Sequence, residues 1–341
     1  MTRSGPVRFA VVGADHLHLF SIVDGLIGAG AVAAAHVPAG TFIGAYAGWQ
    51  SASEPIELAD LLADPSIDLV VTVGVPADRA AVAVAALGAG KSVVSAKPGM
   101  TSPAQLDAIR AATRDRPGRP YTVLFTERFE NRAVVRAIEL ARGGAIGTVT
   151  RVRGVGPHTL DAPSRPAWFF DPERSGGIIV DLASHQIDEF LTITGDPVDA
   201  VIVDAAAGNV ASPDHPDFED VGSLSIIGGG VEGHHGVDLL SPAGLGTWGD
   251  VRLEVTGTAG TLEVRANIDV CGEPGPEHLF HVDAEGSRRV DVSGVDIGWA
   301  TTLLADLVDD SESLMSQQHV FAVSELSLAA RSQARTWGSA R

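Results

Sequence analysis

The sequence predicts a two-domain protein: a doubly wound α/β domain with a parallel sheet, followed by an α+β domain with a large, mostly antiparallel sheet. Three observations predict this. Strand and helix patterns alternate over residues 1–126, whereas short β runs separated by Gly, Pro and Asp turns dominate residues 199–290. The length of 341 residues is also enough for about two domains. We place the domains at 1–126 and 127–341.

In the first domain, β-rich runs and helix patterns follow one another closely. Residues 68–75 are almost wholly apolar, as is typical of a parallel strand covered on both faces. The other predicted strands are 7–12, 41–47, 91–95 and 121–125, and the predicted helices are 17–27, 57–63, 79–89 and 102–113.

The rhythm changes after residue 126, and this change sets the domain boundary. A helix over 133–142, ended by two glycines, leads into a strand near 148–155, and a further helix is expected over 181–193. Several short strands then follow between 199 and 290, and two helices, 298–308 and 318–335, close the chain.

Composition limits the partners and the compartment. The formal charge of −19 repels nucleic-acid phosphates and anionic lipids, and no Lys/Arg cluster offsets it, so nucleic-acid binding is not expected. No uninterrupted apolar stretch reaches the roughly 18 residues of a membrane span. The N-terminal apolar run is too short for a signal peptide, and one cysteine, Cys271, cannot form an internal disulfide. We therefore expect a soluble, cytoplasmic protein.

The turn after the first predicted strand resembles the phosphate-binding corner of a Rossmann unit, in which a strand ends in glycine before a helix. Only the first glycine of the G-x-G-x-x-G pattern is present, because Asp15 and His18 occupy the other two positions. The alternative is an ordinary strand–helix turn. The residues predicted to contact a dinucleotide are Gly13, Ala14, Asp15, His16, His18, Val75, Arg79 and Lys97.

At the position that would bind the cofactor's ribose, the sequence does not decide between NAD and NADP. The usual ribose-binding carboxylate is expected near Ala47, but the sequence has no acidic residue between Asp24 and Glu54. It also has no Lys or Arg between Arg8 and Arg79. We favour NAD, because the 2′-phosphate of NADP would need a cation and Arg79 is the only nearby one.

Two further motifs carry a family resemblance. The first is the stretch Ala86–Lys91 followed by Ala96-Lys97-Pro98, and the second is Gly176-Gly177 followed by the D-x-x-x-H-x-x-D pattern of 181–188. With Glu127-Arg128-Phe129 after the last strand of the first domain, they resemble the Gfo/Idh/MocA family of NAD(P)-dependent oxidoreductases over nearly the whole chain. One departure is Ala96, which stands where the family has glutamate.

The chemistry of these residues agrees with the resemblance. Lys97 follows a parallel strand at its carboxyl end, where open α/β sheets bind ligands, and its ammonium can stabilise a developing alkoxide. Asp181 and His185 are spaced i, i+4 and so share one face of a helix. The resemblance implies that His185 is the general acid/base, Lys97 an orienting cation, and Asp181 a substrate ligand and partner of both. The alternative is a solvated loop lysine and a surface Asp/His pair.

Substrate contacts are expected from aromatic, imidazole and guanidinium groups of the second domain, since such groups suit sugar faces and hydroxyls. The candidates are Arg128, His158, Trp168, Arg174 and Trp248. No metal is expected, because His16, His18, His185, His234 and His235 do not follow a standard ligand spacing and no cysteine pair supports them.

The sequence thus predicts an oxidoreductase that moves hydride between a nicotinamide cofactor and a hydroxyl or carbonyl carbon of a sugar, cyclitol or related polyol. The resemblance also implies a homo-oligomer, a dimer or tetramer. Two alternatives remain open: a sugar-binding or regulatory protein that has lost turnover, motivated by the degraded glycines and Ala96, and a redox-neutral elimination or epimerisation enzyme that keeps the cofactor.

Overall fold

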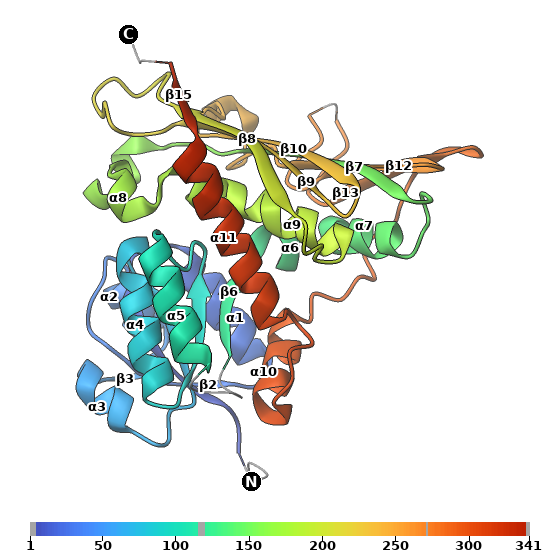
Figure 1. Cartoon of the computed structure of the whole chain (residues 1–341). Helices are drawn as coiled ribbons and strands as arrows, with labels where there is room; N and C mark the ends of the chain where they lie inside the picture. Colours follow the sequence, from blue (N-terminus) through green and yellow to red (C-terminus); the bar gives the residue numbers. More distant parts are fainter. Residues whose placement is uncertain (1–4, 115–119, 271, 339–341) are drawn as a thin grey trace. The chain divides into compact units, whose positions relative to one another are not determined.

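The computed structural model describes residues 5–114, 120–270 and 272–338, so Cys271 lies outside the described residues. The chain divides into two units (Figure 1), which we describe separately. The first unit comprises Met1–Leu124 and Gly298–Ser324, and the second comprises Phe125–Ile297 and Glu325–Arg341. The first unit thus includes a late segment that the sequence predicts as part of its second domain.

The first unit contains a six-stranded parallel sheet in the order β3-β2-β1-β4-β5-β6. This order is that of a dinucleotide-binding sheet, with its switch point between β1 and β4. It confirms the predicted doubly wound domain. The strands are β1 (Arg8–Ala14), β2 (Val32–His36), β3 (Glu54–Pro55), β4 (Leu69–Val73), β5 (Ser92–Ala96) and β6 (Tyr121–Leu124).

Helices of the first unit lie on both faces of this sheet (Figure 1). In the later segment, the Trp299 ring of α10 packs on α1 at Gly25, where a Cβ would lie only 2.5 Å from the ring. The helices are α1 (His18–Gly28), α2 (Ile43–Trp49), α3 (Leu58–Ala63), α4 (Pro76–Gly88), α5 (Pro103–Arg114), α10 (Trp299–Asp309) and the beginning of α11 (Gln317–Gln333).

The predicted strand over 41–47 is wrong, because β2 lies at Val32–His36 and residues 43–49 form α2. Alanine favours helices and is depleted in strands, so the run Ala33-Ala34-Ala35 gives no strand signal. Tertiary pairing overrides that preference: β2 pairs with β1, and Ala33 and Ala35 are buried.

The turn after β1 depends on a glycine. Gly13 has φ +79°, and a Cβ there would lie 2.6 Å from the Gly74 Cα. The ends of β1 and β4 therefore approach each other more closely than any side chain allows. This close approach sits at the switch point of the sheet.

The second unit contains a nine-stranded sheet in the order β14-β13-β12-β11-β7-β10-β9-β8-β15. Among the described strands of this sheet, only β7/β10 and β8/β15 pair in parallel, which confirms the predicted mostly antiparallel sheet. The strands are β7 (Val149–Pro157), β8 (Val201–Gly208), β9 (Val221–Gly228), β10 (Val231–Asp238), β11 (Arg252–Gly257), β12 (Gly260–Arg265), β13 (His278–Asp283), β14 (Gly286–Arg289) and β15 (Arg335–Trp337).

Helices α7 and α9 cover one face of this sheet (Figure 1). Glycines on β7 permit the close packing, since a Cβ at Gly154 would lie 2.7 Å from the Gln186 Cγ of α9. The described helices of this unit are α6 (Thr126–Phe129), α7 (Arg132–Arg142), α8 (Pro172–Ser175), α9 (Ser184–Thr194), the end of α11, the π-helical turn Ile179–Ala183 and the 3₁₀ turns Ala162–Ser164, Ala167–Phe170 and Ala243–Leu245.

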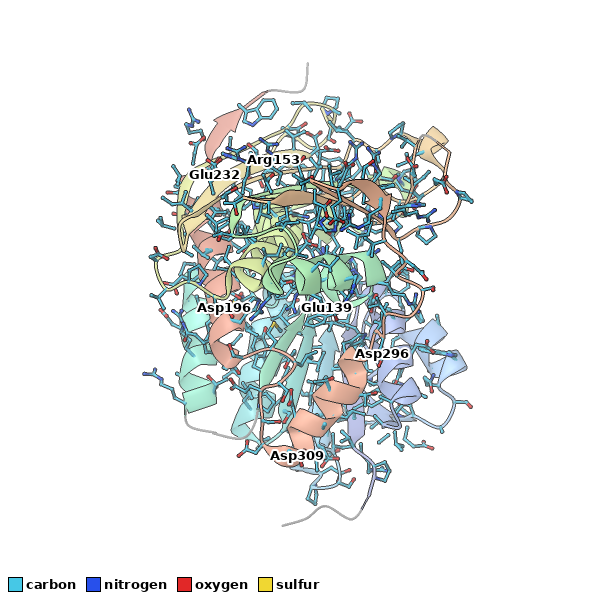
Figure 2. The ribbon with its side chains drawn as sticks, turned by 90° about the vertical axis from the view of Figure 1, so that its right-hand side faces the viewer. Glu139, Arg153, Asp196, Glu232, Asp296 and Asp309 are labelled. Atoms are coloured by element: carbon cyan, nitrogen blue, oxygen red, sulfur yellow. The ribbon has the colours of Figure 1, made fainter. Side chains whose placement is uncertain are left out.

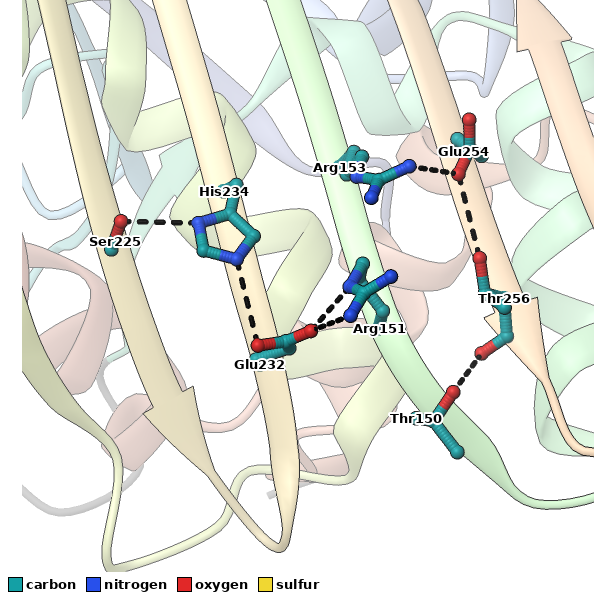
Figure 3. Close-up of polar contacts among 8 residues, drawn as sticks. All are labelled: Thr150, Arg151, Arg153, Ser225, Glu232, His234, Glu254 and Thr256. Carbon is teal, nitrogen blue, oxygen red and sulfur yellow. Dashed lines mark hydrogen bonds and ion pairs between the residues drawn. The ribbon is translucent and has the colours of Figure 1, made fainter.

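The opposite face of the nine-stranded sheet carries cross-strand pairs of opposite charge. Arg151 pairs with Glu232, which also faces His234, and Arg153 pairs with Glu254 at 2.9 Å (Figure 3). Arg153 and Glu232 lie on the side of the sheet turned away from the helices (Figure 2). Such half-exposed pairs contribute about 0–1 kcal/mol each, so this face reads as solvent-compatible and not as core.

None of the described helices combines the length and the apolar composition that crossing a bilayer requires.

Replacing Gly13 by alanine is expected to lower the unfolding temperature. The new methyl would be strained at positive φ and would meet the Gly74 backbone, at a cost of roughly 1–3 kcal/mol. Gly28→Ala is the matched control, because nothing lies within 4 Å of its Cβ position. Thermal unfolding followed by circular dichroism checks both variants. Equal unfolding temperatures for the two variants would contradict the close approach of β1 and β4.

Candidate functional site

In the first unit, Asp15 holds two loops together. Its carboxylate accepts hydrogen bonds from the Thr41 N–H at 2.9 Å and from the Thr41 hydroxyl at 3.0 Å, and its own N–H donates to the Val73 carbonyl. Asp15 replaces the second glycine of the phosphate-binding pattern, yet its charge is engaged by the loop after β2. The side chain therefore serves the shape of the turn.

Helix α1 begins directly after this turn without a side-chain cap at Leu17. His16 Nδ1 accepts a hydrogen bond from the His18 N–H at 3.1 Å, and the two rings pack edge-to-face at 4.2 Å. A helix N-terminus carries partial positive charge and favours an anion such as a pyrophosphate. Together with the Gly13 turn at the sheet's switch point, this end of the unit fits a dinucleotide.

The ribose position differs from the expectation near Ala47. Because β2 ends at His36, the corresponding position falls at Val37-Pro38-Ala39, which offers neither a carboxylate nor a cation. His36 itself is buried and within 3.1 Å of the Ser53 hydroxyl. Burial lowers the pKa of His36, so its ring is neutral at neutral pH. The loop after β2 therefore offers neither a carboxylate for a ribose hydroxyl nor a cation for a 2′-phosphate.

Arg79 joins the ends of β4 and β5. Its Nε donates to the Gly74 carbonyl at 2.7 Å, and its Nη1 faces the carbonyls of Ala96, Lys97 and Pro98 at 2.7–3.0 Å. The side chain is 1% exposed. These contacts give Arg79 a structural part beneath the turn, and a contact of Arg79 with the cofactor stays a prediction.

Lys97 follows β5 directly and is buried. Its carbonyl is one of those that Arg79 holds, so the backbone that carries the ammonium is fixed at the carboxyl end of the sheet. Val75, the residue before α4, is buried at the same end. The structure thus brings together, within the first unit, the residues predicted around the dinucleotide.

In the second unit, the Glu127 carboxylate lies close to two imidazoles, those of His158 and His185. Glu127 Oε1 lies 3.6 Å from His158 Nε2 and 3.8 Å from His185 Nε2. Its other oxygen accepts a hydrogen bond from Gln186 Nε2 at 3.1 Å. We call Glu127, His158 and His185 the Glu127 cluster. It contains two of the residues predicted from the sequence: His185 on α9, which packs on the covered face of the sheet, and His158, which directly follows β7.

A buried ion pair adjoins this cluster. Arg128 donates from Nε and Nη2 to the two carboxylate oxygens of Asp188 at 2.6 and 2.7 Å, and its guanidinium stacks on the Phe129 ring. Asp188 is fully buried. Arg128, predicted as a substrate contact, is therefore committed in this structure to a paired carboxylate. Such bidentate pairs are strong and geometrically specific.

Glu189 is a second buried carboxyl beside the same groups. Burial raises its pKa well above the usual range, and the negative charges of Glu127 and Asp188 raise it further, while Arg128 opposes them. Its Oε1 has no hydrogen-bond partner among the described residues. Burial thus favours the protonated, neutral form of the Glu189 carboxyl.

The predicted aromatic contacts separate. Trp248 is about half exposed and packs against His158 with ring centroids 4.6 Å apart, so it adjoins the Glu127 cluster. Trp168 lies in the 3₁₀ turn Ala167–Phe170 and packs on Phe169, and Arg174 is exposed on α8. Trp168 and Arg174 thus lie on two further elements of this unit.

Asp181 lies in the π-helical turn that precedes α9, so the predicted regular helix over 181–193 is wound differently at its start. π-helical turns are rare in proteins, and those that occur are often found at functional sites. Asp181 lines a small cavity whose walls include Phe169, Ile178 and Glu219. Burial lowers the pKa of Arg165, and the negative charges of Asp181 and Asp161 only partly oppose this shift.

The sequence does not predict Glu127 and Gln186 as site residues, nor the buried Glu189 beside them. Glu127 was visible only as part of the Glu127-Arg128-Phe129 stretch, because nothing in the sequence ties it to residues 158 and 185. His235 is fully buried, and burial lowers its pKa to about 3. Among the described residues, no group of three or more His, Cys, Asp or Glu side chains is arranged to hold a metal ion.

Comparison with solved structures places the fold among oxidoreductases. The chain aligns with a protein from Erwinia carotovora atroseptica SCRI1043, given only the provisional name of oxidoreductase, at 34% identity and TM-score 0.93, covering 97% of this chain and 99% of that one. Levoglucosan dehydrogenase in complex with NADH and levoglucosan aligns at 18% identity and TM-score 0.81, covering 96% and 97%.

A 3-ketoreductase from Actinomadura kijaniata, in complex with NADP and TDP-benzene, aligns at 18% identity and TM-score 0.78, covering 97% of this chain and 99% of that one. The search of curated proteins returns no match. The family model of the GFO/IDH/MocA C-terminal domain matches residues 134–263, within the second unit. From these matches and the six-stranded parallel and nine-stranded mixed sheets, the chain belongs to the Gfo/Idh/MocA family of oxidoreductases.

Proposed function

We propose that this protein is a nicotinamide-dependent oxidoreductase that acts on a hydroxyl or carbonyl carbon of a sugar, cyclitol or related polyol. The observation that carries the proposal is the Gly13 turn at the switch point of a six-stranded parallel sheet, followed directly by the N-terminus of α1. The residues there fit the pyrophosphate of a dinucleotide. The Glu127 cluster of the second unit offers the imidazole that acid–base chemistry needs.

The cofactor would be held by the first unit. The backbone of Gly13, Ala14 and Asp15 and the start of α1, with His16 and His18, would face the pyrophosphate, and Val75 and Lys97 would lie toward the nicotinamide side. A bound nicotinamide would supply the hydride acceptor or donor. Two of the structurally similar proteins are complexes with NADH and with NADP, and both forms are compatible with the uncharged loop after β2. We favour NAD, because that loop provides no cation for a 2′-phosphate.

The residues of this chain would divide the remaining work. The Lys97 ammonium would donate a hydrogen bond to the substrate oxygen and stabilise its negative charge. His185 would take the proton of a hydroxyl during oxidation and return it during reduction, a task for which an imidazole is chemically suited. Asp181 would accept a hydrogen bond from a neighbouring substrate hydroxyl.

Substrate recognition would fall to the second unit. The exposed Trp248 ring beside His158 is of the kind that packs on a sugar face. Arg128, Trp168 and Arg174 stay predictions as substrate contacts. The complex of levoglucosan dehydrogenase with levoglucosan supports a sugar-like substrate for this chain.

We also propose that the protein is a homo-oligomer, a dimer or tetramer. The uncovered face of the nine-stranded sheet exposes large apolar side chains between its charged pairs, among them Val155, Val201 and Ile227. Light scattering on the purified protein is expected to give two or four times the mass of one chain. A mass of one chain at micromolar concentration would contradict this proposal.

Cofactor binding is the first test of function. Titration with NADH and with NADPH, followed by nicotinamide fluorescence, is expected to saturate, and more tightly for NADH. A response to neither cofactor at millimolar concentration would end the enzyme proposal. Saturation without turnover on any polyol would favour the binding or regulatory protein, and product without net NADH would favour elimination or epimerisation.

Substitution of the proposed catalytic groups tests their roles. Lys97→Ala and His185→Ala are each expected to reduce kcat by about 10²–10⁴ on any polyol that the protein oxidises, because each removes charge stabilisation or proton transfer in the transition state. Asp309→Asn is a control, since Asp309 is exposed at the end of α10 (Figure 2). Full activity in either alanine variant, with NADH binding intact, would remove that residue from the mechanism.

A further inference from the structure

We propose that Glu127 is a positioning residue that holds one proton between His158 and His185, so that the proton taken up by His185 can pass to the partly exposed His158. The role in the reaction rests on the function proposed above, whereas the sharing of the proton rests on geometry within the second unit alone.

Glu127 is held in one orientation. Its carboxylate is 6% exposed, and Oε2 accepts the hydrogen bond from Gln186. Gln186 is itself buried and wedged against β7, since Cβ atoms at Gly154 and Gly156 would lie within 3 Å of its side chain. The amide therefore turns Oε1 toward the two imidazoles, at 3.6 and 3.8 Å.

The hydrogen bond on the far side of His158 fixes its tautomer. His158 Nδ1 lies 3.1 Å from the Gly156 carbonyl, which can only accept, so Nδ1 carries a hydrogen. In a neutral His158 the opposite atom, Nε2, would present a lone pair to the Glu127 carboxylate. Two such acceptors facing each other repel, and a proton between them removes the repulsion. In the proposed arrangement that proton lies either on His158 Nε2 or on the carboxyl, and the 3.6 Å between Nε2 and Oε1 is the distance of an ion pair and not of a hydrogen bond.

The surrounding charges leave Glu127 as the anion that the imidazoles face. From α6 and α9, Arg128 neutralises Asp188 in a bidentate pair, and burial raises the pKa of Glu189, which favours its neutral form. From β10, the buried His235 is neutral. The net negative charge of Glu127 therefore favours a protonated imidazole at one of its two neighbours.

This arrangement suits the proton balance of alcohol oxidation. Oxidation of CH–OH to C=O releases one proton besides the hydride that the cofactor accepts, and that proton goes to His185. His185 is 2% exposed and cannot pass it directly to water, but His158 is 17% exposed. His158 would release its Nε2 proton to solvent, the proton on His185 would pass through Glu127 to replace it, and the reverse order would supply a proton for reduction.

The test is a nuclear magnetic resonance titration of ¹⁵N-histidine-labelled protein without cofactor or substrate. In Glu127→Gln, the apparent pKa values of His158 and His185 are expected to fall by about one unit or more, because the amide is isosteric but uncharged. Glu139→Gln is the matched control, since Glu139 is half exposed on α7 (Figure 2) and should leave both values unchanged. Unchanged values in a folded Glu127→Gln protein would overturn the proposal.

A second variant keeps the proposal testable if the Glu127→Gln protein does not fold. In His158→Gln, Glu127 faces one imidazole only, so the pKa of His185 is expected to rise, and an unchanged value would again count against proton sharing. In activity, Glu127→Gln is expected to reduce kcat by about 10–100-fold with little change in KM and to shift the pH profile, with partial rescue by Glu127→Asp. Titration shifts without turnover in any variant would leave the shared proton standing and refute the proposed function.

Discussion

The hydrogen bonds of the Arg79 guanidinium are the interaction on which the carboxyl end of the parallel sheet in the first unit depends. A buried charge is costly unless it is hydrogen-bonded, and here four carbonyls from the ends of β4 and β5 accept hydrogen bonds from the Nε and Nη1 of Arg79. A lysine has one donor group and could not reproduce a fork that spans two strands. Because one of these carbonyls belongs to Lys97, the same contact fixes the backbone of the proposed catalytic cation.

In the second unit, a buried charge is stabilised by an ion pair. Asp188 is fully buried and tolerable only because Arg128 binds both of its oxygens. Glycines on β7 let α9 approach the sheet, and this approach places Gln186 against Glu127. The orientation of His185 and the position of its carboxylate neighbour therefore follow from packing on the covered face. The uncovered face, with its exposed ion pairs, imposes no such constraint (Figure 3).

The sequence predicts the architecture well, because long periodic segments such as 68–75 and 79–89 carry strong patterns. It fails at β2, where three alanines form a strand only through pairing with β1. It also cannot place Glu127 beside His158 and His185, since nothing local links residues so far apart in the chain. Arg79 shows the same limit, because nothing in the sequence indicates the four carbonyls that its guanidinium contacts.

The central claim is that the Gly13–His18 turn holds a dinucleotide. The most direct measurement is a crystal structure of the protein grown with NADH. The account predicts that the pyrophosphate lies against the backbone N–H groups of this turn and the start of α1. A nucleotide bound elsewhere on the chain, or a turn that stays empty under saturating NADH, would contradict it.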